Sequence, residues 1–358
     1  MARFHPLEVA EVGRETDDCI TVRFAVPPEL RPVFAHAAGQ HLILKATVGG
    51  EELRRTYSVC SAEGSGELVV AVKRQPGGRF SAWAAEALKP GAAVEVMPPA
   101  GRFTVEPDPA AARLYVALVA GSGITPVIAI LKTLLEREPR SRFVLVYGNR
   151  TTASIIFREE LEDLKNRHMT RLSLYHVLSG EPVDVPLLQG RIDPAKLRAL
   201  CASAIDPAAV HAWLLCGPAP MIGELTTTLL DLGIERQRIR FEYFTAEGNQ
   251  PRQRPTAAPE AGGRHGSRVT VIADGRRTDF DLAPGGPSIL DAALAAGADL
   301  PFACKGGVCC TCRARLVEGR VAMAANYALE DEELAKGYVL ACQSRPLTDR
   351  VVLDYDSA

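Results

Sequence analysis

Short apolar runs separated by polar turns fill the first 105 residues of the chain. Residues 22–26, 41–46, 56–60 and 67–74 are rich in β-branched and aliphatic side chains, and glycine, proline or charged residues separate them. Such runs are typical of short strands. Their spacing predicts a small antiparallel β-barrel.

The pattern changes beyond this region to longer elements of two alternating kinds. Residues 114–120 form an apolar run typical of a buried strand, and a glycine turn separates them from a helical stretch at 126–136. Strands alternating with helices indicate a parallel α/β domain. The further elements we expect are strands at 143–147, 172–177 and 213–216 and a helix at 155–167.

Residues 245–267 interrupt the apolar pattern with proline, glycine, alanine and polar residues, as in an interdomain linker. Two strands, at 269–273 and 278–282, and a helix at 288–296 follow it, before a cysteine-rich loop. We therefore expect a multi-domain α+β protein. The predicted parts are a barrel at 1–107, an α/β domain at 108–244, the linker, and a C-terminal module at 268–358.

Composition narrows the classes of protein that fit these elements. The 358 residues carry a net charge of −2 and no lysine- or arginine-rich run, so we expect no binding to nucleic acid. The uncharged stretch at 114–131 has the length of a short membrane span, but Gly121–Pro126 interrupts it, and strand, turn and helix fit better. The nine cysteines are odd in number and unevenly placed, and the N-terminus shows no signal peptide. A cytoplasmic protein with a metal site is the expectation.

Four cysteines have the spacing of an iron–sulfur site. Cys304, Cys309 and Cys312 follow the pattern C-x4-C-x2-C, and Cys342 comes much later. Three sulfurs on one tight loop and a distant fourth form the plant-type ferredoxin pattern for a [2Fe–2S] cluster. A zinc site with four cysteine ligands is the alternative, although zinc sites usually pair two short C-x2–4-C motifs.

Other residues around this loop have less specific roles. Gly306 and Gly307 allow backbone to approach inorganic sulfide closely. Cys310 breaks the ligand spacing, so we interpret it as a packed non-ligand. The acidic run 330–333 can face an electron acceptor, but a solvated helix start is the preferred interpretation.

Two motifs in the predicted barrel are suited to a flavin nucleotide. In the strand Arg55-Thr56-Tyr57-Ser58, the arginine and tyrosine point to one face, where they can clamp a phosphate and present a ring to a flat cofactor. A strand with an exposed arginine is the alternative. A second motif begins a helix, and its free amides and serine hydroxyl can bind a pyrophosphate. A simple turn and helix cap is the alternative for this motif. Its residues are Gly77, Gly78, Arg79, Phe80 and Ser81.

The α/β region carries a nucleotide turn and two further motifs. Gly121, Ser122, Gly123, Thr125 and Pro126 follow a buried strand and open a helix, which is the context of a phosphate-binding turn. Pro126 stands where a Rossmann turn has glycine, and proline suits a first helical position. A plain turn between strand and helix is the alternative. The remaining candidates are Cys216-Gly217-Pro218 at one strand end and Glu242-Tyr243-Phe244 at another.

Together these motifs resemble the ferredoxin–NADP⁺ reductase superfamily, in particular the reductases of multicomponent oxygenases. Stretches such as VAGSGITPVIAI and DLPFACKGGVCCTCRARLVEGRVAM resemble, more narrowly, the reductase subunits of phenylacetyl-CoA epoxygenases of phenylacetate degradation. The resemblance covers almost the whole chain and is weakest in the linker. Cys310 departs from it, because the family has a small residue there.

The resemblance implies FAD, a C-terminal β-grasp ferredoxin domain and a role for each motif. Arg55 would bind FAD phosphate, Tyr57 would pack on the isoalloxazine, and Ser58 would lie near flavin N5. Cys216 would lie near the nicotinamide, with Glu242 beside the hydride path. Phe244 would cover the flavin face. On this basis Ser58, Cys216 and Glu242 are the candidate catalytic residues.

The implied function is electron transfer from NAD(P)H through FAD and a [2Fe–2S] cluster to an oxygenase. NADPH is favoured because Arg150 follows the strand at 143–147 with no acidic residue for a ribose hydroxyl. The alternative is a reductase of another oxygenase, such as a Rieske dioxygenase or di-iron hydroxylase. A zinc-stabilised, non-enzymatic binding module is the more remote alternative.

Overall fold

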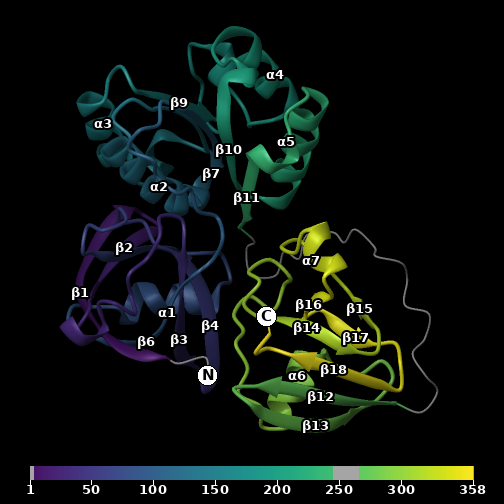
Figure 1. The fold of residues 1–358 in the computed structure, drawn as a ribbon. Helices are drawn as coiled ribbons and strands as arrows, with labels where there is room; N and C mark the ends of the chain where they lie inside the picture. The colour runs from purple at the N-terminus through teal and green to yellow at the C-terminus, as the bar shows by residue number, and fades with distance from the viewer. Residues whose placement is uncertain (1–3, 245–265, 358) are drawn as a thin grey trace. The chain divides into compact units, whose positions relative to one another are not determined.

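The computed structural model describes residues 4–244 and 266–357, which divide into two compact units (Figure 1). The larger unit contains the central sheet and the N-terminal sheet apart from residues 54–56, and the smaller contains the C-terminal sheets. The predicted linker lies outside the described residues except for its last two, of which Ser267 already begins a strand. The domain boundaries therefore remain predictions.

Six strands of the N-terminal region form the predicted antiparallel barrel. They lie in the order β4-β3-β6-β1-β2-β5, and a bridge between Val59 and Val70 brings the end of β4 back to β5. The aliphatic side chains of alternate strand positions fill the interior with Phe80. The elements are β1 (His5–Thr16), β2 (Cys19–Ala25), β3 (His41–Val48), β4 (Glu51–Ser58), β5 (Leu68–Lys73), β6 (Ala93–Ala100) and α1 (Arg79–Ala87).

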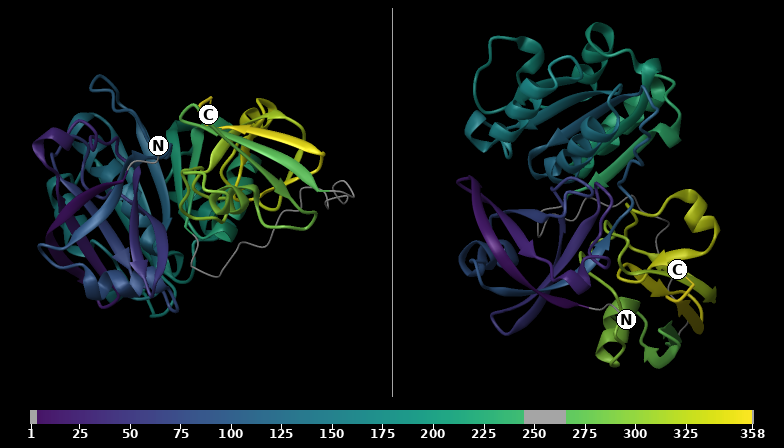
Figure 2. Two further views of the ribbon diagram at one scale, coloured as in Figure 1. Left: turned by 90° about the horizontal axis from the view of Figure 1, so that it is seen from below. Right: turned by 60° about the vertical axis from the view of Figure 1, so that its left-hand side comes forward.

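The central sheet is parallel throughout and has the order β11-β10-β7-β8-β9. Helices cover both of its faces, α2 and α3 on one and α4 and α5 on the other (Figure 2). Burial on both faces explains the continuous apolar run of β7. The elements are β7 (Leu114–Ala120), β8 (Arg142–Asn149), β9 (Leu172–Leu178), β10 (Val210–Gly217), β11 (Ile239–Tyr243), α2 (Ile124–Arg137), α3 (Arg158–Arg167), α4 (Pro194–Ser203) and α5 (Ala219–Asp231).

This topology predicts a crevice at one edge of the sheet. From β7 the chain proceeds to β8 and β9 on one side, whereas β10 and β11 lie on the other. Ligands of open α/β sheets bind at such a reversal, outside the carboxyl ends of the strands. The uncharged stretch at 114–131 is thus β7, a turn and half of α2, and none of the described helices is long and apolar enough to cross a membrane.

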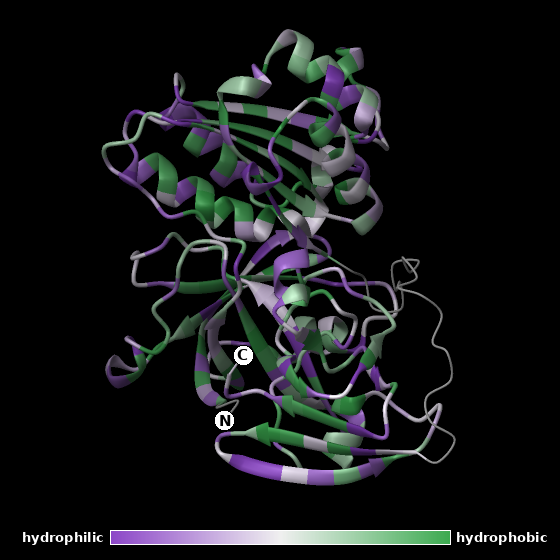
Figure 3. Ribbon diagram, turned by 45° about the vertical axis from the view of Figure 1, so that its right-hand side comes forward, coloured by the Kyte–Doolittle hydropathy of each residue, from purple (hydrophilic) through white to green (hydrophobic). Residues whose placement is uncertain are grey.

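The C-terminal unit is a mixed sheet of order β13-β12-β18-β14-β16, with α6 packed against it in the predicted β-grasp arrangement. Strand β13, with the sequence RRTDFDL, is a polar edge strand, drawn largely purple in Figure 3. The elements are β12 (Ser267–Ala273), β13 (Arg276–Leu282), β14 (Arg313–Glu318), β15 (Val321–Met323), β16 (Tyr338–Leu340), β17 (Ser344–Pro346), β18 (Arg350–Asp354), α6 (Ile289–Ala295) and α7 (Asp331–Ala335).

Two predicted helix starts differ from the structure. Helix α3 begins at Arg158 rather than at residue 155, because Phe157 has a left-handed backbone with φ of 59° that no helix can include. The amide of Phe157 donates instead to Glu15 Oε2 in the barrel, at 3.1 Å. Helix α2 begins at Ile124, so Pro126 is its third residue and not its first. Pro126 still fits because the first-turn amides need no helical partner.

Candidate functional site

The three candidate catalytic residues come from neighbouring strand ends of the larger unit. Ser58 is the last residue of β4, and its Oγ donates to Glu242 Oε2 of β11 at 3.4 Å. Cys216 of β10 pairs in register with Glu242, so their side chains lie on the same side of the parallel sheet. The structure therefore brings together a hydroxyl, a carboxylate and a thiol that lie far apart in sequence.

Burial controls the chemistry of this group. Ser58 and Cys216 are 4% and 0% exposed. Burial raises the pKa of the Cys216 thiol well above its usual range, and the Glu242 carboxylate adds to the rise. Cys216 is consequently a neutral thiol at neutral pH, suited to shaping a pocket rather than to nucleophilic attack.

His41 completes the group, and the sequence analysis did not select it. It is the first residue of β3, is 4% exposed, and places Nδ1 3.6 Å from Glu242 Oε1. Its Nε2 is buried and has no hydrogen-bond partner among the described residues. An unpartnered buried nitrogen beside Ser58 fits a bound group with polar atoms, such as a flavin. The available signal was a histidine opening an otherwise apolar strand, which burial alone also explains.

The predicted FAD phosphate residues lie on β4 and at the start of α1. Arg55 and Tyr57 are both half-buried on one side of β4, and the Tyr57 ring centroid lies 5.8 Å from that of Phe80. Phe80 itself is fully buried in the barrel core, and the Tyr57 ring packs against it. Tyr57 is thus the less buried of the two rings, and its predicted contact with the isoalloxazine remains a prediction. Thr56 is also half-buried on β4.

The Gly77-Gly78 turn presents backbone rather than a hydroxyl. Ser81 Oγ accepts from the amide of Gln75 at 3.1 Å and donates to the carbonyl of Gly78 at 3.2 Å. This hydroxyl holds the turn closed, and its contact with pyrophosphate stays a prediction. Gly77 has a φ of 75°, and a Cβ there would meet nothing within 4 Å. Open space above the turn and the amides that start α1 fit a phosphate group.

The glycine turn after β7 lies at the reversal of the strand order. Gly121 has a φ of 54° and open space above it, whereas a Cβ on Gly123 would lie 2.4 Å from the carbonyl oxygen of Cys216. Thr125 Oγ1 donates to the carbonyl of Ser122 at 3.1 Å, so this hydroxyl also closes its own turn. The turn is therefore pressed against β10 on one side and open on the other, as a phosphate-binding turn requires.

The remaining nucleotide candidates end neighbouring strands of the same edge. Gly217 accepts from the amide of Phe244 at 3.0 Å, which ties the end of β10 to the residue after β11. Pro218 caps α5. Arg150, directly after β8, has an exposed side chain at this edge. These positions surround the crevice that the topology predicts.

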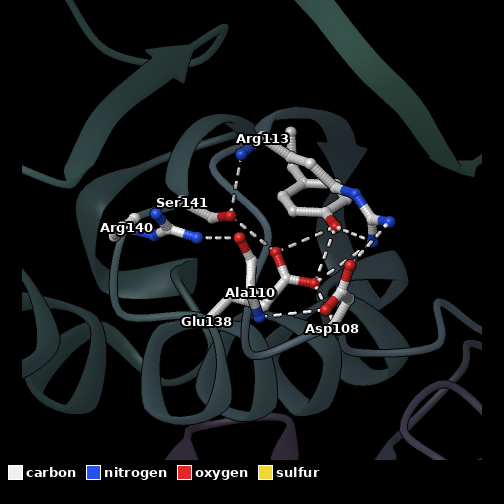
Figure 4. Close-up of polar contacts among 7 residues, drawn as sticks. Asp108, Ala110, Arg113, Glu138, Arg140 and Ser141 are labelled. Atoms are coloured by element: carbon white, nitrogen blue, oxygen red, sulfur yellow. Dashed lines mark hydrogen bonds and ion pairs between the residues drawn. The ribbon is translucent and has the colours of Figure 1, made fainter.

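A polar cluster at the opposite, amino end of the sheet has a structural role (Figure 4). Glu138 is fully buried and accepts from Ser141 Oγ at 2.6 Å and from the amide of Asp108 at 2.9 Å. The Tyr115 hydroxyl contacts both carboxylate oxygens, and Arg113 lies 3.4 Å away. Because its oxygens are satisfied, Glu138 anchors the segment between barrel and sheet and is no candidate for catalysis.

In the smaller unit, the four predicted cluster ligands form two pairs. Cys304 is hydrogen-bonded to Cys309, and Cys312 to Cys342. The bond from Cys309 lowers the pKa of Cys304 to about 6, and the bond from Cys312 lowers the pKa of Cys342. In residues 4–244 and 266–357 no three His, Cys, Asp or Glu side chains converge on one ion. Two pairs of thiols suit a cluster of two irons, which takes two cysteines at each.

The surroundings of the cysteine pairs also fit a cluster. The amide of Gly306 donates to Cys304 Sγ at 3.3 Å, as amides near cluster sulfurs do. The buried hydroxyl of Tyr355 has no partner among the described residues. Burial raises the pKa of Tyr355 well above its usual range, and the nearby Cys312 and Cys342 raise it further. An unpartnered donor near these thiols fits an acceptor such as a cluster sulfur.

The two secondary expectations around the loop agree with the structure. Cys310 packs against the core of this unit and lies outside both pairs, with a φ of 55°. The acidic run starts α7: Glu330 is its N-cap, and Glu330 and Glu333 form a reciprocal capping box. The run is thus a helix start, as preferred in the sequence analysis.

The chain matches three known domain families in order. Residues 6–105 match the oxidoreductase FAD-binding domain, residues 118–226 the oxidoreductase NAD-binding domain, and residues 271–347 the 2Fe-2S iron-sulfur cluster binding domain. The solved structure of phthalate dioxygenase reductase superimposes on this chain with a TM-score of 0.62 and 24% sequence identity. The aligned region covers 98% of each chain. At that identity the likeness shows the fold alone.

Two relatives match along nearly their whole length. One is a component of the 1,2-phenylacetyl-CoA epoxidase of Escherichia coli, 47% identical over 357 residues that cover 100% of this chain and 99% of the relative. The other is the ferredoxin reductase component of 3-ketosteroid-9-alpha-monooxygenase from Rhodococcus rhodochrous. It is 34% identical over 356 residues, which cover 98% of this chain and 96% of the relative. The chain therefore belongs to the ferredoxin–NADP⁺ reductase superfamily, among the NAD(P)H-dependent oxidoreductases of oxygenase systems that carry FAD-binding, NAD-binding and C-terminal [2Fe–2S] domains.

Proposed function

We propose that this chain passes electrons from NADPH through FAD and a [2Fe–2S] cluster to the oxygenase component of a phenylacetyl-CoA epoxidase. The observation that carries the proposal is the 47% identity, along the complete chain, with a component of that enzyme. Reduction of a different oxygenase is the second candidate, supported by the relative from the steroid monooxygenase.

Bound FAD would supply the exchange between two-electron hydride chemistry and single electrons for the cluster. We propose Arg55, Thr56, Tyr57 and the Gly77-Gly78 turn to hold it, with Phe80 and Ser81 supporting that turn. The Gly121–Pro126 turn and the segment Cys216–Pro218 would hold the nucleotide.

The chain's own residues would manage the proton that accompanies hydride chemistry. Ser58 Oγ donates a hydrogen bond to Glu242 Oε2 at 3.4 Å, and His41 Nδ1 lies 3.6 Å from the other carboxylate oxygen. We propose that these three groups carry a proton between the buried site and the outside. Phe244, half-buried against the core, would exclude water from the flavin face.

The preference for NADPH is assigned to Arg150, because a guanidinium pairs strongly with a phosphate. We predict that Arg150→Ala lowers the ratio of kcat/KM for NADPH to that for NADH by roughly tenfold. Arg142→Ala is the matched control, since Arg142 is an exposed arginine at the other end of β8. An unchanged ratio in Arg150→Ala would show that the assignment is wrong.

The test of the proposed function is reconstitution with purified oxygenase components. We expect a yellow-brown protein with equimolar FAD, bleached by NADPH, which supports phenylacetyl-CoA epoxidation with its oxygenase and not steroid hydroxylation with the other. The reverse preference would favour the second candidate. A colourless protein with bound zinc would contradict both.

A further inference from the structure

The residue after the fourth cysteine ligand connects two distant parts of the cluster loop. The side-chain amide of Gln343 donates to the carbonyl of Lys305 at 2.7 Å and to Cys342 Sγ at 3.7 Å. One NH₂ group carries two hydrogens, so it can make both bonds at once. Gln343 thus joins the first turn of the cysteine loop to the sulfur of the last ligand.

The Gln343 side chain is held in place by its own backbone and by the loop. The backbone amide of Gln343 donates to the carbonyl of Leu340, and its backbone carbonyl accepts from the amide of Ala324, both at 2.9 Å. Gly307 packs directly on it: a Cβ there would lie 3.2 Å from Gln343 Cγ. A side chain that starts from a hydrogen-bonded backbone and packs against Gly307 presents its donor at a lower entropic cost.

The loop carbonyl that Gln343 contacts belongs to a strained residue. Lys305 has a left-handed backbone with φ of 50°, which is uncommon for a residue other than glycine. Its ammonium also pairs with Asp291 at 2.7 Å. Bonds at both its backbone and its side chain stabilise the conformation that sets the direction of the loop beyond Cys304.

We propose that Gln343 is a positioning residue that raises the reduction potential of the cluster by donating a hydrogen bond to Cys342 Sγ. This inference rests on the proposed function, since it requires the cluster. One electron entering the cluster adds one negative charge to the iron–sulfur–thiolate unit. A donor bonded to a ligand sulfur stabilises that more negative state, so the potential rises.

The test compares two substitutions that remove an amide near the loop. Gln343→Met keeps the length of the side chain but has no donor. Asn326→Leu is the control, because the Asn326 side chain bonds only backbone atoms of Leu329 in the described structure, although Tyr327 beside it contacts Gly307. The measurement is the midpoint potential of the cluster in the full-length protein, by redox titration followed by electron paramagnetic resonance.

We expect Gln343→Met to shift the equilibrium roughly tenfold toward the oxidised cluster, which for one electron is a fall of about 59 mV. Gln343→Glu should lower the potential further, since it replaces the donor with a negative charge. Asn326→Leu should leave the potential unchanged. Equal potentials in wild type and Gln343→Met, or an equal fall in Asn326→Leu, would overturn the proposal.

A measurement on the wild-type protein tests the proposal even if the substituted proteins fail to hold a cluster. Glutamine labelled with nitrogen-15 only at the side-chain amide should give a hyperfine coupling to the reduced cluster in pulsed paramagnetic resonance. A reduced cluster without that coupling would rule out the hydrogen bond to sulfur. Wild-type protein without any cluster would instead contradict the proposed function, so the two failures are distinguishable.

Discussion

Ser58, Glu242 and His41 show what single residues contribute to the site. They lie in strands β4, β11 and β3, and only the fold brings Ser58 Oγ and His41 Nδ1 to 3.4 and 3.6 Å from the Glu242 carboxylate. The sequence motif identified Ser58 and Glu242 but not their contact. It missed His41, because a histidine in an apolar strand has no distinguishing pattern of its own.

We predict that Ser58→Ala slows reduction of the flavin by NADPH about 10- to 100-fold, because the hydroxyl that connects the site to Glu242 is lost. Stopped-flow absorbance of the flavin band measures this rate, and the Kd for nucleotide should change little. Ser61→Ala is the control: Ser61 is also buried, but its hydroxyl donates to the carbonyl of Glu67. Equal rates in the two variants would remove Ser58 from the reaction path.

The turn between β7 and α2 shows what an element contributes. Its two glycines are equivalent in the sequence motif, but the structure shows that each position requires glycine for a different reason. Gly121 is required by its left-handed backbone, and Gly123 by its approach to the carbonyl of Cys216. Sequence predicted the strand, turn and helix here, but not which glycine faces β10, because that depends on the strand order.

We predict that Gly123→Ala destabilises the protein by about 1–3 kcal/mol and weakens nucleotide binding, since its Cβ forces the turn away from β10. Gly121→Ala should cost only about 1–2 kcal/mol of backbone strain and leave the contact with β10 intact. Melting temperature and nucleotide titration of both variants test this. A lower melting temperature in Gly121→Ala than in Gly123→Ala would contradict the assignment of Gly123 to the close approach to β10.

Other elements show where pattern reading reaches its limit. The hydrophobic pattern does not identify strands β1 and β6, because β1 mixes polar residues into its length and β6 contains Pro98-Pro99. Both still pair in the barrel, where neighbouring strands supply what the local sequence lacks. Ser81 is expected to meet the pyrophosphate and Thr125 to help hold the nucleotide; each hydroxyl bonds within its own turn, and the cofactor contacts stay predictions.

At the scale of the whole molecule, the hydrophobic pattern predicted the barrel and the parallel sheet, whereas the C-terminal β-grasp fold was implied by the family resemblance. Short alternating runs became the antiparallel barrel, alternating strands and helices became the parallel sheet, and the region around the cysteines became the mixed sheet. The two compact units have separate hydrophobic cores. Loss of the cluster should therefore leave flavin chemistry in the larger unit intact.

We predict that Cys342→Ser abolishes the cluster absorbance and lowers reduction of cytochrome c at least tenfold, because an alcohol is a far poorer iron ligand than a thiolate. NADPH should still bleach the flavin, and ferricyanide reduction should continue. Cys201→Ser, a half-buried cysteine far from the ligands in sequence, is the control. Loss of FAD from Cys342→Ser would show that the two units depend on each other.

The parallel pairing of β12 with β18 has a consequence for the history of such chains. These strands are neighbours in the sheet, although they enclose almost all the other elements of the C-terminal unit in the sequence. A break between them would separate the middle of the sheet, whereas a junction outside them leaves every strand paired. The unit is thus a cassette that gene fusion can join to other domains intact.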